Sequence, residues 1–476
     1  MTRRSCWRSS ASTAGSPSMS DPSPRGAAET KRRQQRAWYF YDWANSAFST
    51  TVVTVFLGPY LITLAEDTAG ADGRVGFLVW DVRPGSYFSL LVSLSVILQV
   101  LVLPVTGAIA DKAGHQRQLL ATFAAIGSVA TMLMVVLTDG RYVLGGLLFV
   151  IANLAFGMSV VVYNAFLPQI STPDERDQVS SRGWALGYLG GAVLLVVNLA
   201  LFLGHEGFGI TEREAVRISL LSAGIWWALF TVIPVVGLRG VRRPAGQPGD
   251  AAGQPDVPKG GVLTSGFRQL AGTLRDIRRY PQTLLFLLAY LLYNDGIQTV
   301  IALAAVYIEK ELLLNTSVSI SVILLVQIVA FAGALALGRL AARWGAQQVI
   351  LGALVVWGGV LVVAFFLPQN QVAGVYAIAA VIGFVLGGSQ ALSRSLYSQL
   401  IPRRREAEYF AFYEISERGT SWLGTLTFAL AFEVSGSYRV AIVILVVFFV
   451  SGGLLLRRVR VGEAIDAVGN SRPAVL

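Results

Sequence analysis

The feature that most constrains this chain is a series of twelve long runs of mostly apolar residues. A run of about 17–25 such residues crosses a bilayer as a helix, because a helix satisfies its own backbone hydrogen bonds where water is absent. The runs do not alternate in polarity, as the strands of a membrane β-barrel do. We therefore predict an all-α integral membrane protein with twelve transmembrane helices. The predicted spans are Trp38–Leu64, Ser86–Ala110, Leu119–Leu137, Tyr142–Asn164, Gly183–Leu203, Ile218–Leu238, Thr283–Tyr307, Val318–Leu340, Val349–Leu367, Val372–Ser393, Phe410–Phe432 and Val440–Leu456.

Composition excludes several other classes of protein. Hydrophobic residues make up 54% of the chain and charged residues 14%, whereas a soluble domain carries about 25% charged residues. The single cysteine, Cys6, rules out a disulfide scaffold. The two histidines, His115 and His205, both fall between apolar runs. We therefore expect no metal site and no cofactor.

The basic residues indicate membrane topology rather than nucleic-acid binding. The net charge is +10, but the Lys and Arg residues gather in the tails and loops beside the apolar runs. With both termini in the cytoplasm, 31 of the 38 Lys and Arg residues lie on the cytoplasmic side, which agrees with the positive-inside rule. Residues 1–37 lack the apolar stretch of a signal peptide. We expect a monomeric, multi-pass protein of the cell membrane whose partners are lipid and a small solute, not nucleic acid.

The apolar runs divide the chain into five parts. We predict a disordered cytoplasmic tail at 1–37, a six-helix bundle at 38–238, a cytoplasmic linker at 239–281, a second six-helix bundle at 282–458 and a cytoplasmic tail at 459–476. The linker contains an apolar stripe from Leu263 to Ile277 with four arginines opposite it. This pattern predicts either an amphipathic helix on the membrane surface or a short helix packed under the bundle.

Two motifs recur between the halves. The stretch Gly107–Gly114 (GAIADKAG) is matched by Gly338–Gly345 (GRLAARWG) at an offset of 231 residues. The stretch Tyr163–Pro168 is matched by Tyr397–Pro402 at an offset of 234 residues. Two matches at nearly one offset indicate two pseudo-symmetric halves duplicated in parallel. Such halves place a binding site between them, near the membrane midplane.

The sequence resembles the major facilitator superfamily, because Gly107–Gly114 is similar to that superfamily's signature after the second span. A closer resemblance is to its vacuole-effluxer-like branch, whose fungal members export amino acids from the vacuole. The stretches that carry it are Tyr41–Phe48, Tyr163–Pro168, Gly183–Gly191, Tyr293–Thr299 and Arg405–Phe410. The resemblance implies a secondary transporter that works by alternating access.

The signature loops are the predicted gating elements. In the first half they comprise Gly107, Asp111, Lys112 and Gly114, and in the second half Gly338, Arg343 and Gly345. We predict that Asp111 faces the positive amino end of span eleven, near Glu408–Phe412, although a solvated loop pair of Asp111 with Lys112 is the plain alternative. Two departures from the family pattern are present. His115-Gln116 replaces the usual basic pair after Gly114 in the first half, and Ala342 lacks the acid that Asp111 supplies, so the second-half gate differs from the family pattern.

Asp295 is the first candidate for a substrate or proton site. A charge inside a bilayer costs several kcal/mol, on the order of 2.5 or more, and needs a partner, water or a proton. Asp295 lies about 18 Å into span seven, close to mid-depth, with Gln298, Asn294 and Tyr290 nearby on the helix. We interpret it as a ligand for a substrate amine or as a proton carrier. The alternative is an acid bonded to a neighbouring helix.

Asp42 is the second candidate, near the start of span one with Asn45 one turn on. It is interpreted either as a substrate or gate residue or as an acid favoured there by the helix dipole.

Glu414 and Arg418 stand four residues apart on one helix and are predicted to pair with each other.

Two further helix faces are predicted to line the cavity. Asn153 and Asn164 share a face of span four, and Gln390 and Arg394 share a face of span ten. Arg394 can meet a substrate carboxylate, but the interpretation we favour from sequence is that it snorkels to the nearby cytoplasm.

The leading functional hypothesis is a secondary transporter of a small solute, with amino acids as the favoured class and proton coupling through carboxylates. The chain lacks a phosphate-binding G-x-x-x-x-G-K-[ST] loop, so ATP is not expected to drive it. A drug or lipid exporter is the alternative of the same fold. A channel is less favoured because no filter repeat is present. A membrane enzyme is less favoured because the spans hold no histidine or cysteine for a nucleophile–base pair.

Overall fold

The computed structural model of the 476-residue chain describes residues 24–70, 72–112, 115–138, 140–241, 275–418 and 421–476. The first span is a composite of α1 (Pro24–Ala47), the π-helix η1 (Phe48–Phe56) and α2 (Leu57–Glu66). The other elements are β1 (Val75–Phe77), β2 (Trp80–Val82), α3 (Pro84–Lys112), α4 (Gln116–Leu133), η2 (Met134–Val136), α5 (Tyr142–Ala165), α6 (Leu167–Ile170), η3 (Pro173–Glu175), α7 (Arg176–Leu203), η4 (His205–Phe208), α8 (Glu212–Gly237), α10 (Pro281–Val306), η6 (Tyr307–Glu311), α11 (Thr316–Trp344), α12 (Ala346–Phe366), α13 (Val372–Gln399), α14 (Glu406–Arg418), α15 (Ser421–Ser435), α16 (Tyr438–Val443), α17 (Val446–Arg458) and α18 (Val461–Ala467).

Most of the predicted spans correspond to long apolar helices. Within the described residues, eleven helices are long and apolar enough to cross a membrane. The remaining predicted span, Phe410–Phe432, falls on α14 and α15, between which residues 419–420 are not described. The chain is therefore a nearly all-helical membrane protein. A short antiparallel hairpin, β1 with β2, is the exception, and it joins α2 to α3.

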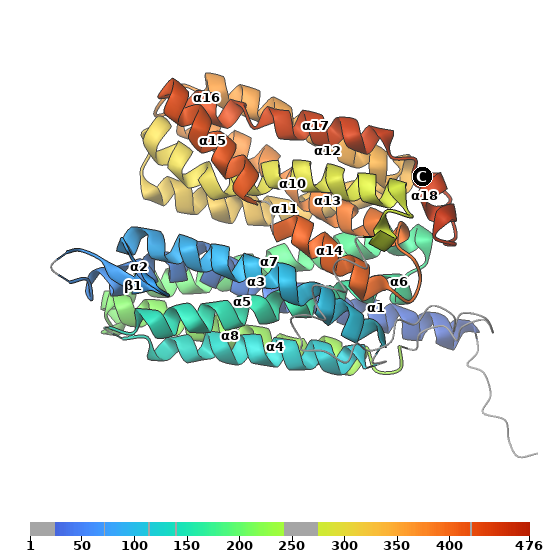
Figure 1. Ribbon diagram of the computed structural model, residues 1–476, viewed down its shortest axis with the longest axis horizontal. Helices are drawn as coiled ribbons and strands as arrows, with labels where there is room; N and C mark the ends of the chain where they lie inside the picture. Colours follow the sequence, from blue (N-terminus) through green and yellow to red (C-terminus); the bar gives the residue numbers. More distant parts are fainter. Residues whose placement is uncertain (1–23, 71, 113–114, 139, 242–274, 419–420) are drawn as a thin grey trace, which may run out of the picture.

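The helices gather into two blocks that follow the chain order. In Figure 1 the blue-to-green helices α1–α8 form the lower block, and the yellow-to-red helices α10–α17 form the upper one. Each block has its own cluster of buried apolar side chains. One cluster is drawn mainly from residues 38–238, and the other from residues 277–465. We call the end of the molecule with the start of α1 and with α18 the terminus side, and the end with the β-hairpin the hairpin side (Figure 1).

The amino-terminal tail is shorter than the sequence predicts. We expected disorder throughout residues 1–37, but α1 begins at Pro24. The side-chain amide of Gln35 is buried and donates to the Ile170 carbonyl at 2.9 Å, and Lys31 Nζ lies 2.5 Å from a Glu175 carboxylate oxygen. These tertiary contacts to the segment between α5 and α7 hold a stretch that its own polarity would leave unfolded.

The central linker and the carboxyl-terminal tail are the two other segments predicted outside the bundles. The apolar stripe of the linker lies outside the described residues up to position 274, so the predicted amphipathic helix is not described by the structure. The carboxyl-terminal segment is more ordered than a plain tail, because it contains α18. Asn470 beyond it donates to the carbonyls of Gln399 and Ile401, at 2.9 Å each, and so packs the segment under α13.

Candidate functional site

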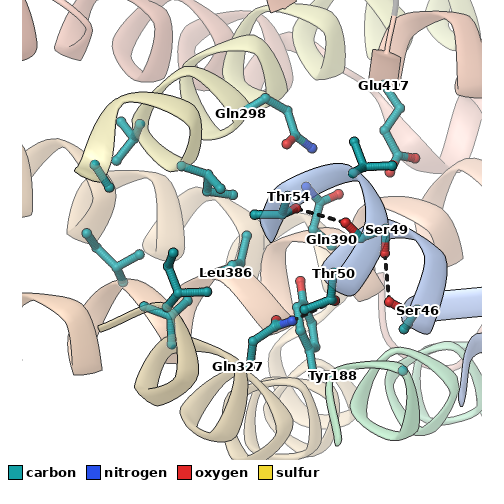
Figure 2. A pocket seen from close by; sticks show the side chains of 18 of the residues that line it. Ser46, Ser49, Thr50, Thr54, Tyr188, Gln298, Gln327, Leu386, Gln390 and Glu417 are labelled. Carbon is teal, nitrogen blue, oxygen red and sulfur yellow. Dashed lines mark hydrogen bonds between the residues drawn. The ribbon is translucent and has the colours of Figure 1, made fainter. Parts of the chain in front are cut away.

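A cavity of about 510 Å³ lies between the two blocks. Figure 2 shows side chains from both halves around it: Ser46, Ser49 and Thr50 come from the first half, and Gln298 and Gln390 from the second. Of the residues that the sequence proposed for binding, the lining contains Asp42, Asn45, Asn153, Asn164, Gln298, Gln390 and Arg394. Amides, hydroxyls and a few charges set in an apolar wall are typical of a site for a small solute.

An ion pair between the halves stands at one end of this cavity. Arg394 of α13 donates to Asp42 of α1 through Nη1 and Nη2, each 3.1 Å from Oδ2. The Tyr163 hydroxyl donates to the same carboxylate oxygen at 2.8 Å, and Ser180 accepts from Arg394 through both its hydroxyl and its carbonyl at 2.9 Å. The arginine side chain is 2% exposed. The sequence interpretation that Arg394 snorkels to the cytoplasm is therefore wrong, because a carboxylate inside the protein holds the guanidinium there.

Aromatic rings and glycines complete the surroundings of Arg394. The guanidinium carbon lies 4.8 Å from the centre of the Trp38 ring and 5.3 Å from that of Trp184, so the cation has two π partners. A Cβ at Gly183 would lie 2.6 Å from Asp42 Oδ2, and one at Gly187 would lie 2.9 Å from the Ser46 hydroxyl. The G-x-x-x-G spacing on α7 thus provides the close helix approach that the ion pair requires.

A second polar cluster joins the halves through α14. Asn164 of α5 donates to Glu414 at 2.9 Å, and Arg418 donates to the other oxygen of Glu414 at 3.2 Å. The predicted pairing of Glu414 with Arg418 is confirmed. The Arg418 guanidinium also lies 4.3 Å from the centre of the Phe156 ring, in the first half. The ion pair itself lies within α14, and the Asn164 hydrogen bond and the Phe156 ring connect it to the first half.

Glu417 is a cavity residue that the sequence reasoning missed. Its side chain points into the cavity in Figure 2, and in the described part of the chain it has no ion-pair partner. The cavity lining holds three carboxylates (Asp42, Glu414 and Glu417) and two guanidiniums (Arg394 and Arg418). The signal that could have found it is the run of charges at Glu414–Arg418 inside a predicted span. One negative charge is left over for a cation or a proton.

The π-helix η1 supplies hydroxyl groups to the opposite wall. The Thr54 hydroxyl donates to the Ser49 carbonyl at 2.8 Å, and the Gln327 amide of α11 donates to the Thr50 hydroxyl at 3.0 Å, which links the halves (Figure 2). A π-helix has backbone hydrogen bonds from residue i to residue i+5, is rare, and occurs frequently at functional sites. The Ser/Thr-rich stretch of span one was the signal for this wall.

Asp295, the first candidate from sequence, lies outside the lining of the cavity. Its Oδ2 accepts from the backbone N–H of Gly424 at 2.5 Å, and its Oδ1 is buried without a partner among the described residues. The side chain of Asn294 accepts a hydrogen bond from the Gln390 amide at 2.9 Å and so orients Gln390 toward the cavity. The Tyr290 ring stacks on Tyr413, with ring centres 4.4 Å apart. The structure thus brings Gln298 to the cavity but not Asp295, Asn294 or Tyr290, and proton carriage by Asp295 stays a prediction.

The first signature loop contacts the second half on the terminus side. Asp111 accepts from the backbone N–H groups of Ala407 (3.2 Å) and Glu408 (2.9 Å), at the amino end of α14. The predicted contact of Asp111 with that helix end is confirmed, and its gating role stays a prediction. A Cβ at Gly107 would lie 2.5 Å from the Ala407 carbonyl oxygen, so α3 and α14 touch backbone to backbone. Lys112 ends α3.

The second signature loop makes a reciprocal contact. Gly338 of α11 packs against the side chain of Ser181 on α7, as Gly107 of α3 packs against α14. Gly345 has a φ of +81°, a value that favours glycine, and ends α11, while Arg343 stands exposed in the last turn. Gly114, in the first loop, lies outside the described residues.

Further polar contacts close the cavity on the terminus side. Arg176 donates to the Ser398 carbonyl at 3.1 Å, the Ser180 hydroxyl donates to the Ala391 carbonyl at 2.7 Å, and the Ser395 hydroxyl donates to Asp177. In the other direction the lining continues to Leu312 and Leu367 near the hairpin side. The solute pathway in this conformation is therefore sealed at one end.

Comparison with protein families identifies similar chains over nearly the whole length. The family model described as "Vacuole effluxer Atg22 like" matches residues 30–468. The MFS-type transporter YxiO of Bacillus subtilis (strain 168) is 28% identical over 426 residues, which cover 89% of this chain and 94% of that protein. Autophagy-related protein 22-1 of Penicillium rubens is 25% identical, with 90% of each chain covered.

Solved structures of similar shape are major facilitator superfamily transporters. A bacterial homologue of the iron transporter ferroportin in an outward-facing state has a TM-score of 0.62 and 14% identity, covering 90% of this chain and 98% of that one. The E. coli fucose:proton symporter has a TM-score of 0.62 and 12% identity, covering 90% of this chain and 97% of that one. At such identities the likeness concerns the fold alone.

Proposed function

The chain belongs to the vacuole effluxer Atg22-like family of MFS-type transporters, and from this premise we propose that it carries an amino acid or a similar zwitterion across the membrane. Members of the superfamily are secondary transporters and not enzymes. The proposal adds the solute class to that general activity.

The observation that carries the proposal is the charge pattern of the cavity. Arg394 and Arg418 present guanidinium groups, while Glu417 presents a carboxylate without an ion-pair partner among the described residues. An α-amino acid carries one group complementary to each, a carboxylate for a guanidinium and an ammonium for Glu417. The amides of Gln298 and Gln390 can hydrogen-bond the rest of a small polar solute.

Transport is proposed to proceed by alternating access of two pseudo-symmetric six-helix bundles. The reciprocal contacts of α3 with α14 and of α11 with α7 support this arrangement, because equivalent helices then meet across the pseudo-twofold axis. With both termini in the cytoplasm, the sealed terminus side is the cytoplasmic side, and the conformation faces outward. The solute must break the Asp42–Arg394 pair or bind beside it before the cytoplasmic side opens.

Proton coupling is proposed to use the same carboxylates. Alternating access requires the contacts between the halves to separate, which takes Arg394 away from Asp42 and the Asn164 amide away from Glu414. A proton or a substrate ammonium can compensate a carboxylate exposed in this way, at less cost than an unpaired charge inside the membrane. This coupling links the gradient to the opening of the cytoplasmic side.

The test uses the full-length chain in proteoliposomes and a panel of four solute classes. The panel contains amino acids, the matching carboxylic acids without an amine, the matching amines without a carboxylate, and hexoses. Only the amino acids are expected to raise the unfolding temperature and to be taken up, because only they satisfy both charges. Uptake of hydrophobic cations or lipids instead would favour the drug- or lipid-exporter alternative, which the apolar part of the wall also accommodates.

A matched pair of variants tests the ammonium contact. Glu417→Gln removes the free carboxylate of the cavity, and Glu433→Gln removes an exposed carboxylate of α15 as the control. Loss of one partner from a buried charge pair costs about 2–5 kcal/mol, so we expect amino-acid affinity to fall about 30-fold or more in Glu417→Gln and not in the control. Equal affinities of both variants would reject the assignment.

A further inference from the structure

A second recess, separate from the transport cavity, lies between α1 and α7 on the terminus side. It has a volume of about 550 Å³. We call it the α1–α7 crevice, and its lining residues from the two helices are Arg32, Gln35, Arg36, Tyr39, Gln178, Val179 and Arg182. None of these residues lines the transport cavity.

The helical spacing of the sequence builds this crevice. Arg32 and Arg36 stand four residues apart on α1, and Gln178 and Arg182 stand four apart on α7, so each pair shares one helix face. The two helices pack along their length, which turns these faces toward each other. Three guanidinium groups thereby converge from two helices on one recess.

The acid of the crevice is already compensated. Glu175 lies at its edge, but its carboxylate binds Lys31 at 2.5 Å and accepts from the backbone N–H of Thr172 at 3.2 Å. Within the described residues, Arg32, Arg36 and Arg182 are exposed and make no ion pair. The recess therefore carries an excess of positive charge.

A buried hydroxyl also lacks a partner there. Tyr39 is 6% exposed, and its hydroxyl makes no hydrogen bond within normal geometry in the described part of the chain. Arg182, Glu175 and Arg36 are the charged groups that act on it, Arg182 most strongly. The guanidinium groups only donate, so an anion in the crevice would accept from them and from the hydroxyl together.

We propose that the α1–α7 crevice binds a phosphate group, supplied by the headgroup of an anionic phospholipid. Guanidinium groups recognise phosphate with two parallel hydrogen bonds, and the Tyr39 hydroxyl adds a third donor. Arg36 and Arg32 precede Trp38, the predicted start of the first span, by about 3 and 9 Å along the helix. This depth corresponds to the headgroup layer, and basic recesses between membrane helices are suited to such lipids.

The experiment titrates the purified full-length chain, held in neutral detergent, with three probes. The probes are short-chain phosphatidylglycerol, short-chain phosphatidylcholine and inorganic phosphate, and the readouts are the unfolding temperature and the bound lipid counted by native mass spectrometry. Phosphatidylglycerol is expected to bind and to raise the unfolding temperature, whereas phosphatidylcholine and inorganic phosphate are expected to do neither.

Variants locate the bound headgroup. Arg36→Gln and Arg182→Gln are each expected to weaken phosphatidylglycerol binding about fivefold, and the double variant more. Tyr39→Phe, which keeps the ring in place, is expected to weaken it less. Arg33→Gln is the matched control, because Arg33 is exposed on the same helix but does not line the crevice.

Two results would overturn the proposal. Equal binding by Arg33→Gln and the double variant would show that the lipid binds elsewhere. Stabilisation by inorganic phosphate equal to that by phosphatidylglycerol would assign the site to a free anion rather than to a lipid. The unfolding temperature without ligand, measured for every variant, separates loss of binding from loss of folding.

Discussion

The backbone contact between α3 and α14 leads to a quantitative prediction for Gly107→Ala. A Cβ at this position would lie 2.5 Å from the carbonyl oxygen of Ala407 and 2.7 Å from the Cα of Glu408. Both are backbone atoms at the start of α14, so no side-chain rotation relieves the clash. Ordinary contact begins near 3.4 Å, so α14 must retreat from α3 by about 0.9 Å.

That retreat acts on the hydrogen bonds of Asp111. Its two hydrogen bonds from backbone N–H groups measure 2.9 and 3.2 Å. A shift of about 0.9 Å lengthens both beyond about 3.5 Å, which is too long for a hydrogen bond. Each bond to a charged acceptor contributes about 1.5–3 kcal/mol. Allowing for partial rehydration of Asp111, we expect the closed terminus side to lose about 2–4 kcal/mol, a shift of roughly 30- to 700-fold in the conformational equilibrium.

The assay is the distance between spin labels placed on the terminus ends of the two halves, measured by electron paramagnetic resonance in nanodiscs. Gly107→Ala is expected to enrich the conformation in which the terminus side is open. Gly352→Ala is the matched control, because a Cβ on that helical glycine meets no atom within 4 Å. Identical distance distributions for the two variants would refute the reasoning that the close approach of α3 and α14 holds the terminus side closed.

Three further substitutions test other contacts. Asp295→Asn keeps an acceptor for the Gly424 N–H but cannot ionise, so it should abolish pH-driven uptake if Asp295 carries the proton, and unchanged pH dependence would reject that role. Gln327→Leu removes the hydrogen bond to Thr50 across the cavity and should lower the free energy of unfolding by about 1 kcal/mol or less, as measured by chemical unfolding. A loss above about 3 kcal/mol would contradict the assignment of a single neutral hydrogen bond. Asn470→Ala leaves two buried carbonyls without a donor and should lower the unfolding temperature by a few degrees, whereas an unchanged temperature would mean that water replaces the amide.

The general architecture could be predicted from the sequence because a bilayer allows few solutions. Apolar runs of spanning length must be helices, and the predicted spans recur as long helices, with Phe410–Phe432 falling on α14 and α15 on either side of residues that the structure does not describe. The contact of Asp111 with the amino end of α14 was also predictable, since a carboxylate and a helix dipole attract wherever the chain brings them together.

The partners of buried charges could not be predicted in the same way. Arg394 directly follows the predicted end of span ten at Ser393, and nothing within its own helix indicates that Asp42, 352 positions away, would hold it inside. The same limit applies to Asp295. Its depth in span seven could be counted from the sequence, but its side chain lies against Gly424 instead of lining the cavity. Depth follows from counting residues along one helix, whereas direction depends on how that helix is rotated against its neighbours.

The sequence by itself determined that this chain is helical, lies in a membrane and carries a duplicated signature, because each of these follows from local spacing and polarity. Only the tertiary structure decided which charges meet, that Glu417 faces the cavity, and that Arg32, Arg36 and Arg182 converge on a second recess. Such pairings join residues from separate helices, and their energies depend on distances of a few ångströms that helix packing alone sets.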